Sequence, residues 1–205
     1  LPGRLRGVPL MLVAVGLAGS AATGAYVYQN TNVLNDYRNR DDAEIWQADF
    51  ERAYLRYERL AQPRITDARL LVDLQPGQRR FDASGRYTLV NDTGAPVETL
   101  HVRLGDRDTQ MLKLDVPGTT IERDDKRFNY RILRFATPMA PGATTSLDFA
   151  TRRWHRGFPA RGQDRTLIEN GTFLNNSDFA PIIGMDRDAL LTDRITRRKR
   201  GLTGE

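Results

Sequence analysis

A regular alternation of polar and apolar side chains runs through Arg80-Phe81-Asp82-Ala83-Ser84-Gly85-Arg86-Tyr87-Thr88-Leu89-Val90 and ends at Asn91-Asp92-Thr93-Gly94. Successive side chains of a β-strand point to opposite faces of a sheet, so every second residue from Phe81 to Leu89 is predicted to share one buried face. Asn, Asp and Gly favour tight turns. The stretch therefore predicts a half-buried antiparallel strand that turns back sharply.

The same two-residue period continues on both sides of this stretch. Apolar residues alternate from Ala68 to Leu74 before a Pro-Gly turn. Further strand candidates, again punctuated by Pro-Gly pairs, are Leu100–Leu104, Met111–Val116, Phe128–Phe135 and Thr145–Arg153. Short alternating strands with frequent turns predict a mainly β fold, an antiparallel β-sandwich with one face of each sheet buried and the other in water.

The chain begins with a different pattern. No charged residue occurs from Val8 to Tyr28, whereas Arg4 and Arg6 precede this run. At about 1.5 Å per residue, a helix of this length just crosses the roughly 30 Å hydrocarbon core of a bilayer. Positive charge before a membrane helix favours a cytoplasmic N-terminus, so the rest of the chain is predicted to be extracytoplasmic, on the periplasmic side.

Small residues recur at every fourth position of this run, at Gly16, Ser20 and Gly24. They share one helix face, which allows another transmembrane helix to approach closely. The predicted partners of the segment are the lipid bilayer and other transmembrane helices. The alternative is a secretory signal cleaved near Thr23 or Tyr26, but the apolar run is longer than the usual core of a signal peptide.

A helical pattern follows the membrane segment. Asp41 and Asp42 suit the first turn of a helix, where the helix dipole favours negative charge. Apolar residues then recur at spacings of three and four from Trp46 to Leu60, and Pro63 ends the pattern. We expect an amphipathic helix of about 20 residues, whose aromatic stripe packs on the following domain or on a sister membrane helix.

The composition excludes several classes of site. The 205 residues contain no cysteine, so disulfides, thiol nucleophiles and thiolate metal ligands are excluded. The net charge of +5 comes from scattered arginines and not from a basic face with interleaved aromatic residues, so no nucleic-acid partner is expected. The dense cluster Arg197–Arg200 is interpreted as a solvated tail or a helix end.

No catalytic or metal-binding motif is complete. His101 lies in an alternating strand and is predicted to point outward, and His155 has no histidine or carboxylate one helical turn away. The zinc motif HExxH is absent, as is a Gly-x-Ser-x-Gly nucleophile elbow. We therefore expect no catalytic residue, no metal ligand and no cofactor in this chain.

The most distinctive segment is Asn170-Gly171-Thr172-Phe173-Leu174-Asn175-Asn176-Ser177-Asp178-Phe179-Ala180-Pro181. It mixes apolar anchors with side-chain amides and a carboxylate. Two interpretations stay open, an ordered loop that caps the sandwich and a contact surface for a partner. The candidate interface residues are Asn170, Phe173, Leu174, Asn175, Asn176, Asp178 and Phe179.

Three stretches carry a resemblance to a known family: Gln62–Asp67, Tyr87–Gly94 and, most specifically, Asn170–Pro181. Together with the preceding membrane helix, they resemble bacterial membrane proteins in which an ABC-transporter permease is fused to an aminopeptidase-N-type zinc peptidase. The resemblance implies that this chain corresponds to the last permease helix and the amino-terminal β-domain of the peptidase, a saddle-like cap packed against the catalytic domain. HExxH and the Gly-x-Met-x-Asn loop of such peptidases are both absent, so zinc is expected only in a catalytic domain downstream of Glu205.

Four parts of the chain follow from these patterns: a membrane helix with its basic flank (1–28), a linker and amphipathic helix (29–63), a β-sandwich (64–185) and a charged segment (186–205). The leading hypothesis is a membrane-tethered β-domain that is not catalytic by itself. The rival hypothesis is a binding or assembly module that docks on a membrane transporter. The third is a secreted sandwich released from a signal peptide.

Overall fold

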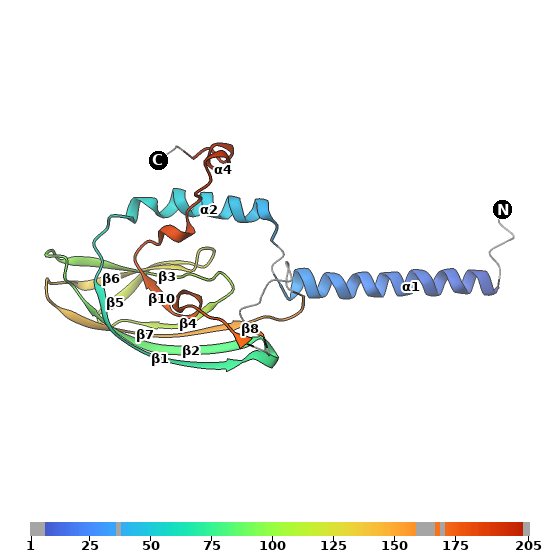
Figure 1. Ribbon diagram of the computed structural model, residues 1–205, viewed down its shortest axis with the longest axis horizontal. Coiled ribbons are helices and arrows are strands. Elements are labelled where there is room, and N and C mark those ends of the chain that lie inside the picture. The colour runs from blue at the N-terminus through green and yellow to red at the C-terminus, as the bar shows by residue number, and fades with distance from the viewer. Residues whose placement is uncertain (1–6, 36–37, 159–166, 169–170, 203–205) are drawn as a thin grey trace. The chain divides into compact units, whose positions relative to one another are not determined.

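The computed structural model describes residues 7–35, 38–158, 167–168 and 171–202. They form two compact units, one drawn from residues 1–38 and 155–164 and the other from residues 39–154 and 165–205. The first unit is built on α1 (Val8–Tyr28), which continues into η2, a π-helical turn (Gln29–Val33). The second unit holds the β-strands (Figure 1).

Helix α1 exposes all of its side chains. Among the described residues it belongs to the one helix that is long and apolar enough to cross a membrane, by length and composition. Gly16 and Gly24 have open space beside them, in which no atom would lie within 4 Å of an added Cβ. Close packing of a second membrane helix on this face stays a prediction.

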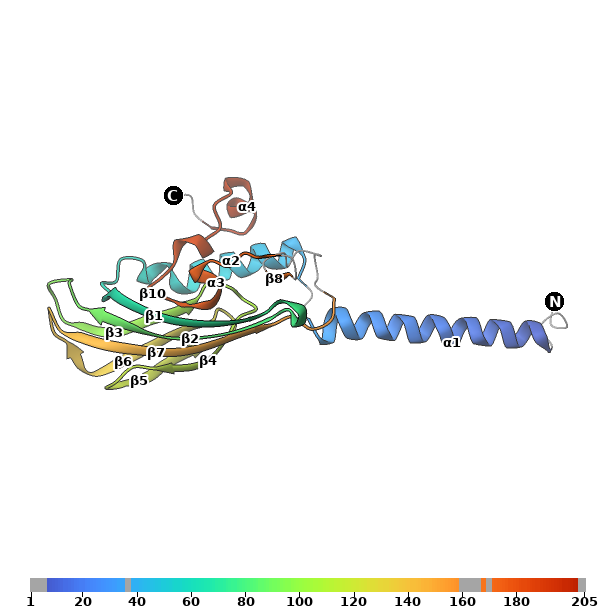
Figure 2. The ribbon, with the colours of Figure 1, turned by 60° about the horizontal axis from the view of Figure 1, so that its bottom comes forward.

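The second unit contains two four-stranded sheets in which all strand pairs are antiparallel, as predicted. The first sheet has the order β1 (Arg64–Gln75), β2 (Arg80–Val90), β7 (Thr144–Trp154) and β4 (Gln110–Asp115). The second has the order β10 (Pro181–Ile183), β3 (Val97–Leu104), β6 (Tyr130–Met139) and β5 (Thr119–Asp125). Strands β1, β2 and β7 curve together along the domain (Figure 2). The turn η4 (Pro76–Gln78) joins β1 to β2, and β8 (Leu167–Ile168) pairs with β9 (Gly171–Thr172).

One apolar core lies between the two sheets. The alternate residues of β2 contribute to it as predicted, with Phe81 and Leu89 completely buried. They meet Leu100 and Val102 of β3 and Phe149 of β7, which lie in the same cluster. The two-residue period of the sequence therefore corresponds to the inner faces of a sandwich.

Helix α2 (Arg40–Tyr54) covers the second face of the sheet that contains β3 and β6, which gives the domain three layers (Figure 1). Its first turn is closed by a capping box, because the Asn39 side chain accepts from the Asp42 N–H and the Asp42 carboxylate accepts from the Asn39 N–H. The aromatic stripe of the helix packs on the sheet, with the Tyr54 and Tyr130 rings stacked at 4.0 Å. The prediction of one wet face per sheet is wrong for β3 and β6, since His101, Tyr130 and Ile132 are buried on the face that the helix covers.

The helix is shorter than the predicted length of about 20 residues. It ends at Tyr54, and a 3-10 turn, η3 (Leu55–Tyr57), replaces its last turns. This turn brings the Tyr57 ring to 4.7 Å from the His101 ring, in an edge contact. Leu60 lies beyond it with 41% of its surface exposed, so it takes no part in the stripe.

Two helical pieces make up the charged C-terminal segment, η5 (Arg187–Ala189) and α4 (Arg194–Lys199). Asp193 caps α4, since its side chain accepts from the Thr196 N–H at 2.8 Å. The two pieces are separated at Leu190 and Leu191, whose side chains are buried.

Gly85 in the middle of β2 offers a test of the sandwich packing. A Cβ at this position would lie 2.7 Å from the Arg69 carbonyl oxygen and 2.9 Å from the Phe149 ring. We expect Gly85→Ala to lower the free energy of unfolding by about 1–3 kcal/mol, because the extra methyl group overpacks the core. Urea unfolding of the detergent-solubilised protein measures the change. Gly171→Ala is the control, since no atom would lie within 4 Å of a Cβ added to Gly171. Equal unfolding midpoints for the two variants would contradict the packing.

Candidate functional site

The predicted interface segment closes one end of the sandwich. It runs through β9, the short helix α3 (Asn176–Phe179) and β10. The Asn175 N–H donates to the Asp178 carboxylate at 2.7 Å, and the Ala180 N–H donates to the Asn176 carbonyl at 2.8 Å. These bonds satisfy groups that a four-residue helix would leave without a partner, so the segment keeps a defined shape.

Several side chains attach the segment to the sandwich. Phe179 is buried and makes an edge contact with Phe81 at 6.4 Å. The Thr151 hydroxyl donates to the Phe179 carbonyl at 2.6 Å, and the Thr109 hydroxyl donates to the Asp178 carbonyl at 2.8 Å. Gly105 lets the segment approach closely, because a Cβ there would lie 2.7 Å from the Ser177 carbonyl oxygen. The loop is therefore held by both its backbone and its apolar side chains.

The predicted interface residues divide into two groups. Leu174 packs partly on the core, while Asp178 and Phe179 serve the attachment. The residues that face solvent are Phe173, Asn175 and Asn176. Phe173 stands out, because 74% of the surface of this large apolar side chain is exposed. Asn170 lies outside the described residues.

A shallow groove of about 530 Å³ adjoins this segment. Asn176, Ser177 and residues 180–183 line one side, and Pro63, Arg64, Ile65 and Tyr87 line the other. It lies between the start of β1 and β10, the edge strands of the two sheets. Phe173 lies earlier in the same segment and does not line this groove.

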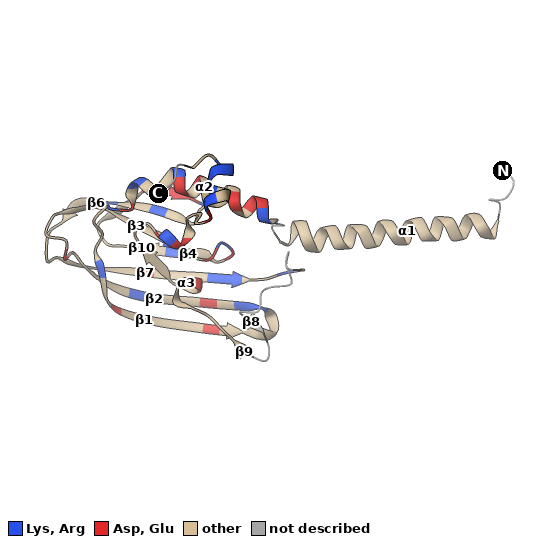
Figure 3. Ribbon diagram, turned by 45° about the horizontal axis from the view of Figure 1, so that its top comes forward, with Lys and Arg blue, Asp and Glu red and all other residues tan. Residues whose placement is uncertain are grey.

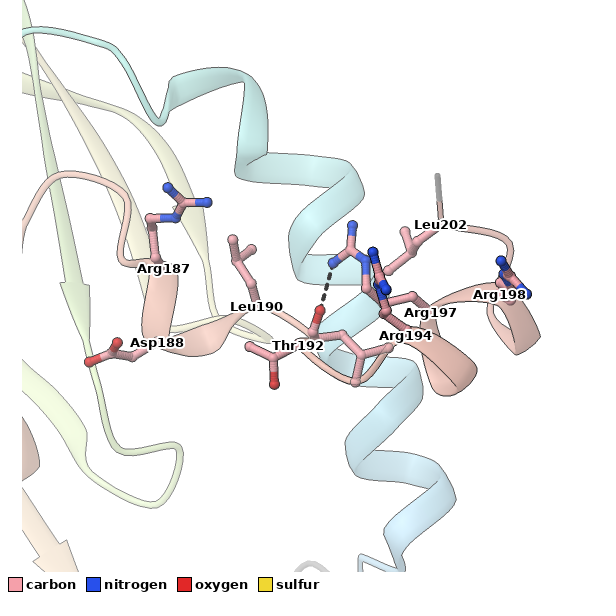
Figure 4. Close-up of a pocket in the computed structure, with 9 residues that line it drawn as sticks. Arg187, Asp188, Leu190, Thr192, Arg194, Arg197, Arg198 and Leu202 are labelled. Carbon is pink, nitrogen blue, oxygen red and sulfur yellow. Dashed lines mark hydrogen bonds between the residues drawn. The ribbon is translucent and has the colours of Figure 1, made fainter. Parts of the chain in front are cut away.

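A second feature, which sequence reasoning missed, is an arginine-rich pocket of about 890 Å³ on the C-terminal segment (Figure 4). Its polar lining includes Arg187, Arg194, Arg197, Arg198 and Asp188. Part of its positive charge is neutralised within the chain, because Arg197 pairs with Glu51 and Arg187 pairs with Glu58. The cluster Arg197–Arg200 forms the last turn and the C-cap of α4, so the interpretation as a helix end is confirmed. It is not a solvated tail, because Arg197 and Arg200 pair with carboxylates of α2.

Ion pairs hold this segment on α2. The two terminal nitrogens of Arg197, Nη1 and Nη2, donate to the Glu51 carboxylate at 2.8 Å, and Nη1 also donates to the Leu191 carbonyl. Arg200 pairs with Asp41 and Glu44. Hydrogen bonds from Lys199 and Arg200 lower the pKa of the Asp41 carboxyl, and a hydrogen bond from Arg200 lowers that of Glu44.

Acidic residues recur along α2, and basic residues lie in the C-terminal segment beside it (Figure 3). Asp41, Glu44 and Glu51 follow a helical spacing of three and seven residues. That acidic stripe, set against the basic cluster at residues 197–200, is the signal that could have predicted the contact.

The prediction that His101 points outward to solvent is wrong. Only 2% of its surface is exposed, because its outward face on β3 lies under α2 and η3. Its Nδ1 atom lies 2.8 Å from the Tyr130 hydroxyl, and its backbone N–H donates to the Gln62 side chain at 2.7 Å. Burial lowers the pKa of His101 from 6.5 to about 4, against a smaller opposing effect of the Glu122 charge.

The described residues of this chain do not fit a zinc ion. HExxH is absent from the sequence, and the described residues include no group of three or more His, Asp or Glu side chains placed to hold a metal. Structural and catalytic zinc sites need about three or four protein ligands. No step of a metal-dependent reaction is therefore assigned to this chain.

A scan against protein-family models finds no match, and a search of curated protein sequences finds none either. Among solved structures, the chain is similar to the M1 zinc metallopeptidase from Deinococcus radiodurans, with 12% identity over 45% of this chain and 20% of that chain and a TM-score of 0.36. A two-domain M1 zinc metallopeptidase mutant bound to L-tryptophan gives 13% identity over 48% of this chain and 21% of that one, also with a TM-score of 0.36.

The chitin-binding domain of a chitinase from Pyrococcus furiosus gives 14% identity over 48% of this chain and 84% of that one, with a TM-score of 0.23. The chain spans about a fifth of the length of the metallopeptidases. Each similarity covers less than half of this chain.

Proposed function

We propose that this chain is a membrane-tethered, extracytoplasmic β-domain that is not catalytic by itself and docks on a zinc-peptidase domain downstream in the same polypeptide. In this proposal α1 is a retained membrane helix, and the sandwich is a cap on the peptidase. The family resemblance of the sequence motivates the choice of partner, and the rival is a module that docks on a separate transporter.

The observation that carries the proposal is the presentation of Phe173. Leu174 packs on the core next to it, and the Asn175–Asp178 bond and the buried Phe179 follow within six residues. The exposed ring is therefore held on an ordered segment, which lowers the entropy lost when a partner binds it. Large aromatic side chains in this situation are enriched among the residues that dominate binding energy at protein interfaces.

The proposal predicts a specific cross-link. A photoreactive benzoylphenylalanine at position 173, in the polypeptide of the complete reading frame, should cross-link to a domain that contains HExxH. The experiment uses native membranes, and mass spectrometry of the cross-linked peptides identifies the contact.

Leu71 provides the matched control position. Its side chain is 72% exposed, and it lies on β1, an edge strand of the first sheet. A probe there should give no cross-link to the peptidase domain. Cross-links from position 173 to a separate transporter protein would favour the rival module. A reading frame that continues without HExxH would overturn the peptidase partner, whatever the probe contacts.

A further inference from the structure

The end of the hydrophobic helix is joined to a distant part of the chain. Where a helix ends, its last carbonyl groups lack partners within the helix. The Asn30 carbonyl in η2 accepts from the Phe158 N–H at 3.0 Å and from the Asn35 side-chain amide at 2.9 Å. The same Asn35 amide also donates to the Phe158 carbonyl at 2.7 Å. Asn35 therefore clamps the segment His155–Phe158 to the end of the helix.

Gly157 makes this contact possible. Its φ of +75° lies in the region that favours glycine. A Cβ at this position would lie only 2.5 Å from the Asn30 carbonyl oxygen, so any other residue would push the segment away from the helix. The segment is fitted to the helix end by backbone shape as well as by hydrogen bonds.

The clamp places an aromatic side chain beside the helix. The Phe158 and Tyr26 rings meet edge to face with their centroids 5.8 Å apart. Both rings stay exposed, as does the ring of Tyr28, two residues further along the helix. From Val8 to Tyr26 the helix rises about 27 Å, at 1.5 Å per residue. The three rings thus lie close to one hydrocarbon thickness from the start of the helix, where aromatic belts occur in membrane proteins.

We propose that the segment His155–Phe158 is a second membrane contact, in which the Phe158 ring enters the interfacial region of a phospholipid bilayer beside Tyr26. The inference rests on the proposed membrane tether. Phospholipid is the occupant that the surface fits, because the ring is exposed next to a helix that has no charged residue and whose side chains are all exposed. The clamp would then fix the segment after β7 at the depth of the interface.

Spin labels at single cysteines test this depth, since the natural sequence has no cysteine. Labels are placed at Phe158, at Tyr26, at Leu17 inside α1 and at Phe173 in the sandwich, in the whole chain reconstituted into phosphatidylcholine vesicles. Accessibility to oxygen and to a water-soluble nickel complex gives the depth of each label. We expect Phe158 to match Tyr26 and to lie between Leu17 and Phe173.

The outcomes separate the inference from the tether. A label at Phe158 as accessible to nickel as that at Phe173, with Leu17 protected, would overturn the inference and leave the tether intact. Nickel access at Leu17 equal to that at Phe173 would overturn both.

Gly157→Ala in the Phe158-labelled protein tests the clamp. We expect the label to shift towards the aqueous accessibility of Phe173, because the added methyl group collides with the Asn30 carbonyl. Gly142→Ala is the matched control, since Gly142 has the same φ of +75° but no atom within 4 Å of an added Cβ. Equal label depth in the two variants would contradict the role of the clamp.

Discussion

Glu51→Ala is expected to lower the free energy of unfolding by about 3–5 kcal/mol, as is usual when one partner of a buried ion pair is removed. The Glu51 and Arg197 side chains retain only 6% and 11% of their exposure. The substitution leaves the Arg197 guanidinium between α2 and the C-terminal segment without its carboxylate. Chemical denaturation followed by tryptophan fluorescence measures the loss, and Trp46 on α2 reports on the same layer.

Glu58→Ala is the matched control for this prediction. Glu58 pairs with Arg187 at 3.0 Å and also links the helical layer to the C-terminal segment, but the Arg187 side chain is 61% exposed. An exposed pair contributes about 0–1 kcal/mol, so the control should change stability little.

The double variant Glu51→Met with Arg197→Leu separates charge burial from packing. It removes both charges and keeps apolar volume, so it should be less destabilised than Glu51→Ala alone. The single variants Glu51→Met and Arg197→Leu complete the comparison. If the loss in free energy of unfolding of the double variant equalled the sum of the two single losses, the two side chains would not act as a pair.

The second large effect is a dependence of stability on pH that originates at His101. The folded protein keeps this imidazole neutral down to a pKa of about 4, whereas an unfolded chain takes up the proton near 6.5. The unfolded state therefore binds more protons between these values, and stability falls as pH decreases through this window. The free energy of unfolding is unaffected by protonation of His101 above pH 6.5. Between pH 6.5 and pH 4 it falls by about 3 kcal/mol, because protonation of His101 favours the unfolded state.

Two measurements check this prediction. The free energy of unfolding of the native protein and of His101→Gln is measured between pH 4 and pH 7. It should depend less steeply on pH in the variant, because the variant lacks the contribution of His101. Nuclear magnetic resonance gives the His101 pKa directly, and His155→Gln assigns the signal because the sequence has only two histidines. A His101 signal that titrates near 6.5 in the folded protein would contradict the burial that the fold imposes.

The strands were predictable wherever one face is buried and the other is wet. The alternation of β2 located the core-facing residues correctly because its outer face meets solvent. Strand β5 was missed, since it is an edge strand with largely exposed residues on both faces and carries no alternation. Strand β10 is three residues long and begins with Pro181, which is too short for any period to show.

The candidate site was predictable as a segment but not in its parts. Its mixture of apolar and amide side chains marked residues 170–181, yet the same composition suits anchors and contacts equally. Only the packing separates Phe179, which is buried against Phe81, from Phe173, which faces solvent. The clamp of Asn35 on Phe158 joins residues 123 positions apart, and no local pattern predicts such a pair.

The sequence by itself determined the membrane-length apolar run, the antiparallel strands and the aromatic stripe of α2, because these depend on the order of neighbouring side chains. The tertiary structure decided what covers each surface. His101 is buried because α2 lies over the second face of its sheet, and Glu51 has a partner because a segment 146 residues away returns to the helix. Burial depends on elements that meet only after folding, so it cannot be deduced from the period of a single strand.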